Sequence, residues 1–105
     1  MLEELFDTIS KVFCWRWPTS QGEVTAVDVE SIVRQGQGEV LRLAVAYKFS
    51  LGADGPYTGE SFWEPGSARV LTAKESIKIG EAVTVRYRPG KPSVNTLDRR
   101  VWREL

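Results

Sequence analysis

The sequence contains no histidine and only one cysteine, Cys14, and these absences exclude most of the common catalytic chemistry. Histidine is the usual general acid or base near neutral pH and the commonest metal ligand. It also activates serine and cysteine nucleophiles, so those pairs are excluded as well. One cysteine can neither form an intramolecular disulfide nor build a thiolate zinc site. We therefore expect no catalytic residue, no metal and no cofactor, and we predict that the protein is not an enzyme.

An excess of charge is also missing, because 14 Lys and Arg residues balance 14 Asp and Glu residues. A neutral chain lacks the positive field that drives non-specific binding to nucleic acid. No apolar run approaches the roughly 20 residues that a membrane-spanning helix needs. The first residues include Glu3 and Glu4 and show no basic segment, unlike a secretory signal peptide. We expect a cytoplasmic protein without a transmembrane span.

What is present is enough for one small folded domain. The chain has 105 residues and a mass of 11.8 kDa, and 42% of its residues are hydrophobic. A chain of this size has room for a single hydrophobic core. Within this one domain we expect an N-terminal amphipathic helix over residues 1–17 and a small β-domain over residues 18–105.

Apolar residues at helical spacing mark the expected N-terminal helix. They are Leu2, Leu5, Phe6, Ile9, Val12 and Phe13. This spacing places them on one face, which we expect to pack on the core or on a second copy in a homodimer. Contact with a membrane surface is the alternative, although the polar face is acidic rather than basic. Cys14 lies off the apolar stripe, and we expect it to be unreactive.

Alternation of apolar and polar residues predicts β-strands in the rest of the chain. The pattern is clearest over residues 39–51, where Tyr47 and Phe49 share the parity of the aliphatic residues and are expected inside. The expected elements are a turn at 19–22, strands at 23–33, 39–51 and 57–63, a helix at 68–76 capped by Ser67, and strands at 82–88 and 94–102.

These elements predict a mostly-β fold of the α+β type. We expect a small five-stranded twisted sheet or a partly open barrel. The N-terminal helix and a short helix between strands three and four would pack against it.

Glycine, proline and aromatic positions in the chain resemble those of a known family. The last part reads Gly80-x-x-Val83-x-Val85-x-Tyr87-x-Pro89-x-x-Pro92-x-x-x-x-Leu97. Earlier matching positions are Trp17-Pro18, Gly22-x-Val24, Tyr47-x-Phe49 and Tyr57-x-Gly59. Over residues 17–97 the ordered set resembles the bacterial family named domain of unknown function 3592. The resemblance implies a small mostly-β domain, often found beside membrane helices, and it brings no established activity, catalytic residue or cofactor.

Gly59 has two possible structural roles in this pattern. It can lie under an aromatic ring of a neighbouring strand, or it can mark a β-bulge.

The family resemblance also has one departure, because a short charged amphipathic segment begins this chain where those members carry an apolar span.

Basic residues late in the chain form the one candidate interaction surface. They are Arg86, Arg88, Lys91, Arg99, Arg100 and Arg103. Arginines beside strand aromatics are typical of barrels that bind single-stranded nucleic acid, although a solvated strand face explains the same cluster. The carboxylates of Asp54, Glu60 and Glu64 lie near one hairpin, but their spacing matches no known cation site, and we expect solvated surface charge.

Three functional hypotheses follow from these observations. The first is a non-enzymatic protein-interaction or scaffolding β-module that binds itself or another protein through a sheet edge or the N-terminal helix. The alternative is weak single-stranded nucleic-acid binding by a barrel similar to the oligonucleotide-binding fold. The third is an enzyme that uses carboxylates or a lysine.

Overall fold

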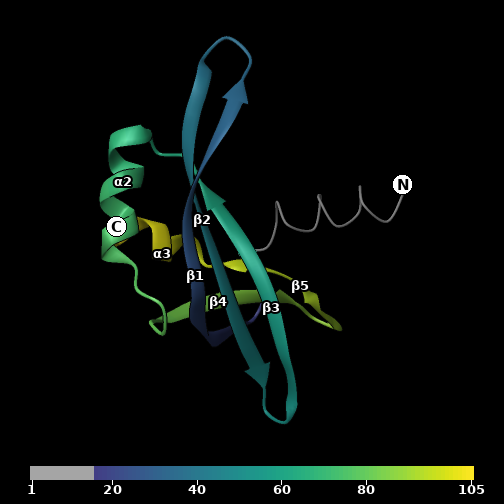
Figure 1. The fold of residues 1–105 in the computed structure, drawn as a ribbon. Coiled ribbons are helices and arrows are strands. Elements are labelled where there is room, and N and C mark those ends of the chain that lie inside the picture. Colours follow the sequence, from purple (N-terminus) through teal and green to yellow (C-terminus); the bar gives the residue numbers. More distant parts are fainter. Residues whose placement is uncertain (1–15) are drawn as a thin grey trace.

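The structure is a computed structural model that describes residues 16–105, which form a five-stranded antiparallel sheet and two short helices (Figure 1). The elements are β1 (Thr19–Arg34), β2 (Gly38–Leu51), β3 (Asp54–Trp63), α2 (Ser67–Ser76), β4 (Ala82–Arg88), β5 (Lys91–Leu97) and α3 (Arg99–Arg103). The strand order is β3-β2-β1-β4-β5. The mostly-β class, the five strands and the helix between the third and fourth strands are therefore confirmed. Of the N-terminal helix expected over residues 1–17, residues 1–15, which include Cys14, lie outside the described residues.

The longest strand, β1, pairs with different partners over different parts of its length. Residues Thr19–Glu23 pair with β4, and residues Gly22–Arg34 pair with β2. The register shifts between Val24 and Ala26, and a bulge of this kind bends a strand and increases its twist. As a result, β4 and β5 cross the part of the sheet that contains β2 and β3 (Figure 1).

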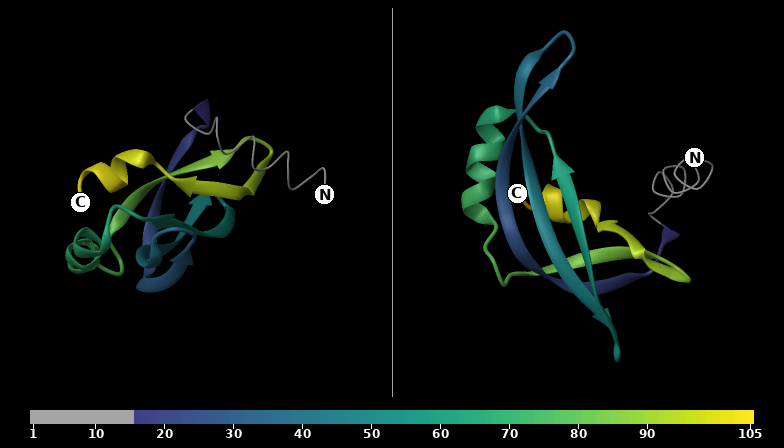
Figure 2. Two further views of the ribbon diagram at one scale, coloured as in Figure 1. Left: turned by 90° about the horizontal axis from the view of Figure 1, so that it is seen from above. Right: turned by 45° about the vertical axis from the view of Figure 1, so that its right-hand side comes forward.

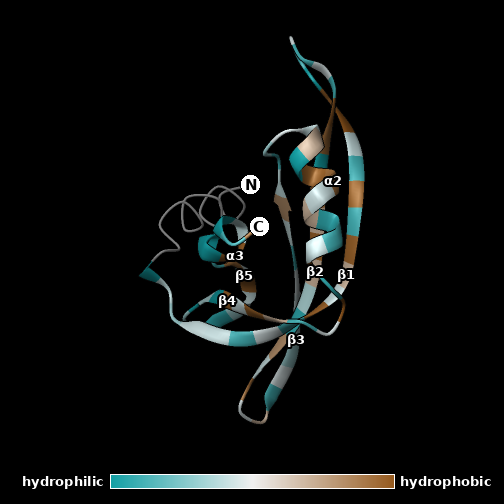
Figure 3. Cartoon of the chain, turned by 90° about the vertical axis from the view of Figure 1, so that its left-hand side faces the viewer, coloured by the Kyte–Doolittle hydropathy of each residue, from teal (hydrophilic) through white to brown (hydrophobic). Residues whose placement is uncertain are grey.

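The hydrophobic core lies on the inner face of this bent sheet. In β2, Tyr47 is 1% exposed and Phe49 is 3% exposed, so the interior position predicted for both is confirmed. α2 stands against β1 and β2 and adds Val70 and Ala73 to the same cluster (Figure 3). β4 adds Val85, which is fully buried. Removal of this apolar surface from water is the main favourable contribution to folding.

The outer strands, β3 and β5, face each other without a backbone ladder between them. Side chains bridge them instead. The Asn95 side-chain amide donates to the Thr58 carbonyl at 3.2 Å, and the Leu97 backbone amide donates to the Ser61 hydroxyl at 3.1 Å. The sheet is therefore open: of the two alternatives expected, the twisted sheet is observed and the barrel is not. The physical reason is that side chains occupy the space in which a closing ladder would form.

Gly59 in β3 allows these side chains to pack closely. It lies opposite Tyr47 in the β2–β3 register, and the Tyr47 hydroxyl donates to Asn95 Oδ1 at 2.6 Å. A Cβ at Gly59 would come within 2.0 Å of Asn95 Oδ1 and 2.5 Å of the Tyr47 hydroxyl. Of the two roles expected for this glycine, the position under an aromatic ring is the one observed.

Burial of Tyr47 makes the stability of the protein sensitive to alkaline pH. Burial raises the pKa of this hydroxyl from its ordinary value of 10.0 to about 12. The unfolded chain therefore loses the proton at lower pH than the folded protein, and the free energy of unfolding falls as the pH rises from 10.0 toward 12. We expect this group to cost about 1.4 kcal/mol per pH unit in that window. Urea unfolding of the wild type and Tyr47→Phe over this range measures the effect, and equal pH slopes for the two proteins would contradict it.

The end of β5 differs from the prediction. Residues 98–102 were expected to continue the last strand, but β5 ends at Leu97 and α3 follows. The Asp98 side chain caps α3 by accepting a hydrogen bond from the Arg100 amide. Trp102 then stacks on Trp63 of β3, with ring centroids 5.6 Å apart. The cap and the stacked rings favour the helix over a longer strand.

Two glycines explain the other local differences. Residues 19–22 were expected to form a turn, but they lie within the first part of β1. Gly22 is needed there for close packing against β4 rather than for a turn, because a Cβ at this position would lie 2.8 Å from Val85 Cγ2. At α2, Gly66 occupies the N-cap position with a φ of 124°. This conformation favours glycine, so Ser67 lies inside the first turn and the predicted serine cap is wrong.

Candidate interaction surface

The basic residues expected to form one surface lie in different parts of the structure. Arg88 and Lys91 face each other across the β4–β5 hairpin, and both are partly buried. Arg99 and Arg103 are exposed on α3, beyond the opposite end of β5. The structure therefore does not join these four side chains into one patch.

Asp98 brings together the two remaining basic residues, Arg86 and Arg100. Its carboxylate is 1% exposed and accepts from Arg86 Nε at 2.7 Å and from Arg100 Nε at 3.1 Å. Arg86 also donates to the Trp17 carbonyl at 2.7 Å. The cluster thus ties the segment before β1 to β4 and α3, and we interpret both arginines as stabilising the fold.

Burial and hydrogen bonding act in opposite directions on the carboxyl of Asp98. Burial alone would raise its pKa, but the hydrogen bonds from Arg100, together with the charge and the hydrogen bond of Arg86, lower the pKa below its ordinary value of 3.8. The carboxylate therefore stays ionised in the folded protein at neutral pH.

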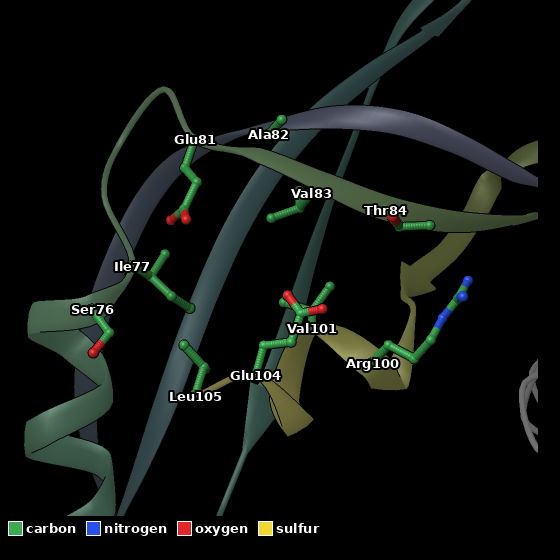
Figure 4. Close-up of a pocket in the computed structure, with 10 residues that line it drawn as sticks. All are labelled: Ser76, Ile77, Glu81, Ala82, Val83, Thr84, Arg100, Val101, Glu104 and Leu105. Atoms are coloured by element: carbon green, nitrogen blue, oxygen red, sulfur yellow. The ribbon is translucent and has the colours of Figure 1, made fainter.

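A hollow of about 350 Å³ lies between the end of α2, the start of β4 and α3 (Figure 4). Ile77 and Val83 contribute apolar surface, and the side chains of Glu81 and Glu104 reach toward the hollow from opposite sides (Figure 4). Glu81 also accepts a hydrogen bond from the Lys78 backbone amide at 3.1 Å. Two carboxylates beside apolar surface suit a cationic group, but they form no nucleophile and base pair, so we assign no reaction to this hollow.

The three carboxylates near the β2–β3 hairpin do not converge on one site. Asp54 accepts from the Tyr57 hydroxyl at 3.2 Å, and Glu64 pairs with Arg34 of β1. Glu60 is exposed on β3. Within residues 16–105, no group of three or more His, Cys, Asp or Glu side chains could hold a metal ion.

A free strand edge runs along the second half of β1. Pairing with β4 ends at Glu23, and two further hydrogen bonds join Val24 to Gly80 and Glu81. From residue 25 to residue 34, the side of β1 away from β2 makes no backbone hydrogen bond to any part of the chain that the structure describes. An unpaired edge of this kind is a template for another strand.

The backbone groups on this edge can be assigned from the hairpin. The Arg34 carbonyl accepts from the Gln37 amide in the turn that leads to β2, so Arg34 points its backbone groups toward β2. Backbone N–H and C=O groups alternate between the two sides of a strand. The residues of opposite parity therefore point their backbone groups to the free edge: Val27, Val29, Ser31 and Val33.

The free edge belongs to a hairpin that extends beyond the rest of the sheet (Figure 2). We call residues 30–42, which lie beyond the last β2–β3 pair (Leu43 with Trp63), the hairpin arm. Arg42 pairs with Glu30 at 2.7 Å across its two strands, and Arg34 near its tip pairs with Glu64 after β3. Val33 at the tip is 82% exposed. The arm is therefore held by ion pairs and still presents unpaired backbone and an apolar side chain to solvent.

Sequence reasoning named a sheet edge as a binding surface without saying which edge. One signal is a difference in length, because the strand expected at 23–33 is longer than the strand expected at 82–88; in the structure β1 has 16 residues and β4 has 7. The register is needed to turn this difference into a free edge, and only the tertiary structure gives the register. The sequence alone therefore could not identify the free edge of β1.

A comparison with known families identifies the family of this chain. Within residues 16–105, no helix has the length and apolar character needed to cross a membrane. No curated protein and no solved structure matches the chain. A family model matches residues 20–102, which is most of the chain. The family resemblance is therefore confirmed, and the chain belongs to the family described as Domain of unknown function (DUF3592).

Proposed function

We propose that the chain is a non-enzymatic protein-interaction module that binds an extended segment by strand addition along the free edge of β1. The observation that carries this proposal is the unpaired backbone of β1 from residue 25 to residue 34. In strand addition, main-chain hydrogen bonds supply affinity, and alternate side chains supply specificity.

The side chains beside this edge indicate the kind of segment that fits. Val27, Val29 and Val33 share the inner face of the sheet, and Val33 is largely exposed. The opposite face of the same strand carries Asp28 and Glu30. A fitting segment therefore alternates apolar residues with polar or basic residues, because each face of the added strand continues one face of β1.

A peptide library tests the proposal without knowledge of the natural partner. We expect extended peptides selected on the wild-type protein to bind Ser31→Pro at least about tenfold more weakly, because proline removes an edge N–H and obstructs the added strand. Ser31→Ala is the matched control, since it loses the same hydroxyl and keeps the amide. Circular dichroism and the Tm show whether each variant is folded.

Two results would overturn the proposal. One is a wild-type protein that is monomeric and yields no binder from the library. The other is a set of binders with equal affinity for Ser31→Pro and Ser31→Ala in folded proteins.

Single-stranded nucleic-acid binding stays an alternative without a specific observation in its favour. Tyr47 and Phe49 are buried and so offer no exposed ring on which bases could stack. Arg86 and Arg100 bind Asp98. The strand edge therefore supports protein recognition better than these groups support recognition of nucleic acid.

A further inference from the structure

We infer that the strand added to β1 comes from a second copy of this chain, in an antiparallel pair centred on Ser31. This inference rests on the proposed function and names its partner. Two β1 strands related by a twofold axis would join their sheets edge to edge. Such a contact is self-complementary, as a twofold interface requires.

The direction of the backbone N–H and C=O groups along the free edge of β1 permits an antiparallel pair centred on Ser31. Ser31 is one of the residues whose N–H and C=O point to the free edge. A twofold axis beside it places Ser31 opposite Ser31 of the second copy, with two reciprocal hydrogen bonds between them. The same arrangement places Val29 opposite Val33 of the second copy, again as a hydrogen-bonded pair.

Charge complementarity favours this register. Asp28 lies opposite Arg34 of the second copy, and the symmetry repeats the pair on the other side of the axis. Opposite charges at directly facing positions stabilise a strand pair, and like charges destabilise it. Arg34 is available to a second carboxylate, because its side chain is 50% exposed and a guanidinium has more donors than Glu64 uses.

The neighbouring registers are less favourable. A centre at Val29 places Asp28 opposite Glu30 of the second copy, so like charges face each other twice. A centre at Ile32 places Glu30 opposite Arg34 of the second copy. This register pairs only residues 30–34, because the turn to β2 begins after Arg34 in each copy. The centre at Ser31 pairs residues 28–34 and sets the largely exposed Val33 beside Val29.

Cysteine cross-linking tests the register directly. In a Cys14→Ser background, which leaves no other cysteine, we expect Ser31→Cys to form an intermolecular disulfide on mild oxidation. Facing residues of a hydrogen-bonded antiparallel pair have Cα atoms about 5.5 Å apart, within disulfide range. Val33→Cys is the matched control and should form no intermolecular disulfide, because residue 33 faces Val29 of the second copy rather than itself. Preferential cross-linking of Ile32→Cys would instead indicate the neighbouring register and overturn the centre at Ser31.

Sedimentation of the full chain tests the charge pair. We expect a concentration-dependent dimer in the wild type. Arg34→Glu should raise the dimer Kd by about tenfold or more, because two opposite-charge pairs become like-charge pairs. The double variant Asp28→Arg with Arg34→Asp restores opposite charges, although it still lacks the bond to Glu64. Recovery of the dimer in this double variant would therefore show that Arg34 acts through its pair with Asp28 of the second copy and not through its ion pair with Glu64 in the same copy.

The outcomes distinguish this inference from the proposed function. If the wild type is monomeric at all concentrations while library peptides still bind the β1 edge, the second-copy inference is overturned and the proposed function stands. If the wild type is monomeric and no peptide binds, both fail. A dimer that neither Ser31→Pro nor Arg34→Glu weakens uses another surface and also overturns the inference.

Discussion

Asp98→Ala is expected to lower the free energy of unfolding by about 3 kcal/mol, because it removes one partner of a buried charge cluster. The carboxylate is 1% exposed and holds Arg86, whose own side chain is only 20% exposed. Without Asp98, Arg86 stays partly buried with its charge uncompensated, and α3 loses its N-cap. Urea denaturation measures the loss. Asp54→Ala is the control, since Asp54 is exposed and its removal should cost less than about 0.5 kcal/mol.

The Asp98→Asn variant separates the charge of this residue from its role as a cap. Asparagine is a good N-cap, so the helix end is retained while the ionic contacts are lost. Because the pKa of Asp98 is lowered in the folded protein, its contribution is present above the unfolded pKa and is lost as the pH falls through the folded value. We therefore expect Asp98→Asn to be less stable than the wild type at neutral pH and to approach it in acid. An equal difference at neutral and acid pH would contradict this explanation.

Gly59→Ala is expected to destabilise the protein by a similar amount, about 3 kcal/mol, through overpacking. The new Cβ would lie 2.0 Å from Asn95 Oδ1 and 2.6 Å from Tyr47 Cζ, so both side chains would have to move. Neither moves easily: Tyr47 is buried, and the Asn95 amide donates to backbone carbonyls, including that of Pro92 at 3.0 Å. Glu60→Ala is the control at the next position of β3, where the side chain is exposed.

A double-mutant cycle identifies the cause of the loss at Gly59. Asn95→Ala removes the atom that the new methyl group meets first. The combined variant should therefore be more stable than the sum of the two single losses predicts, because sites in contact are not additive. Strict additivity would indicate that contact with Asn95 does not contribute to the loss.

Local patterns predicted much of the fold. The alternation in residues 39–51 predicted which side of β2 is buried, because side chains of a strand alternate between its faces wherever it pairs. The same reasoning failed at residues 98–102. There, a cap at Asp98 and the stacking of Trp102 on Trp63 decided the conformation, and the ring partner lies far away in the sequence.

The candidate sites depended even more on distant contacts. The sequence grouped Arg86 and Arg100 with four other basic residues by proximity in the chain. The fold instead placed the buried carboxylate of Asp98 between them. A partner for a charged side chain is set by the packing of whole elements, and no spacing within the sequence reveals it. The free edge of β1 was hidden for the same reason.

The absence of histidine and the single cysteine are properties of composition, and no tertiary arrangement can change the chemistry that they exclude. The strand parities are equally local, since they follow from the two-residue repeat of extended backbone. Tertiary structure alone decided where β1 bends, which part of it β4 covers and which part stays unpaired. Strand pairing depends on the relative placement of distant segments, and a bulge of one residue in β1 alters that placement.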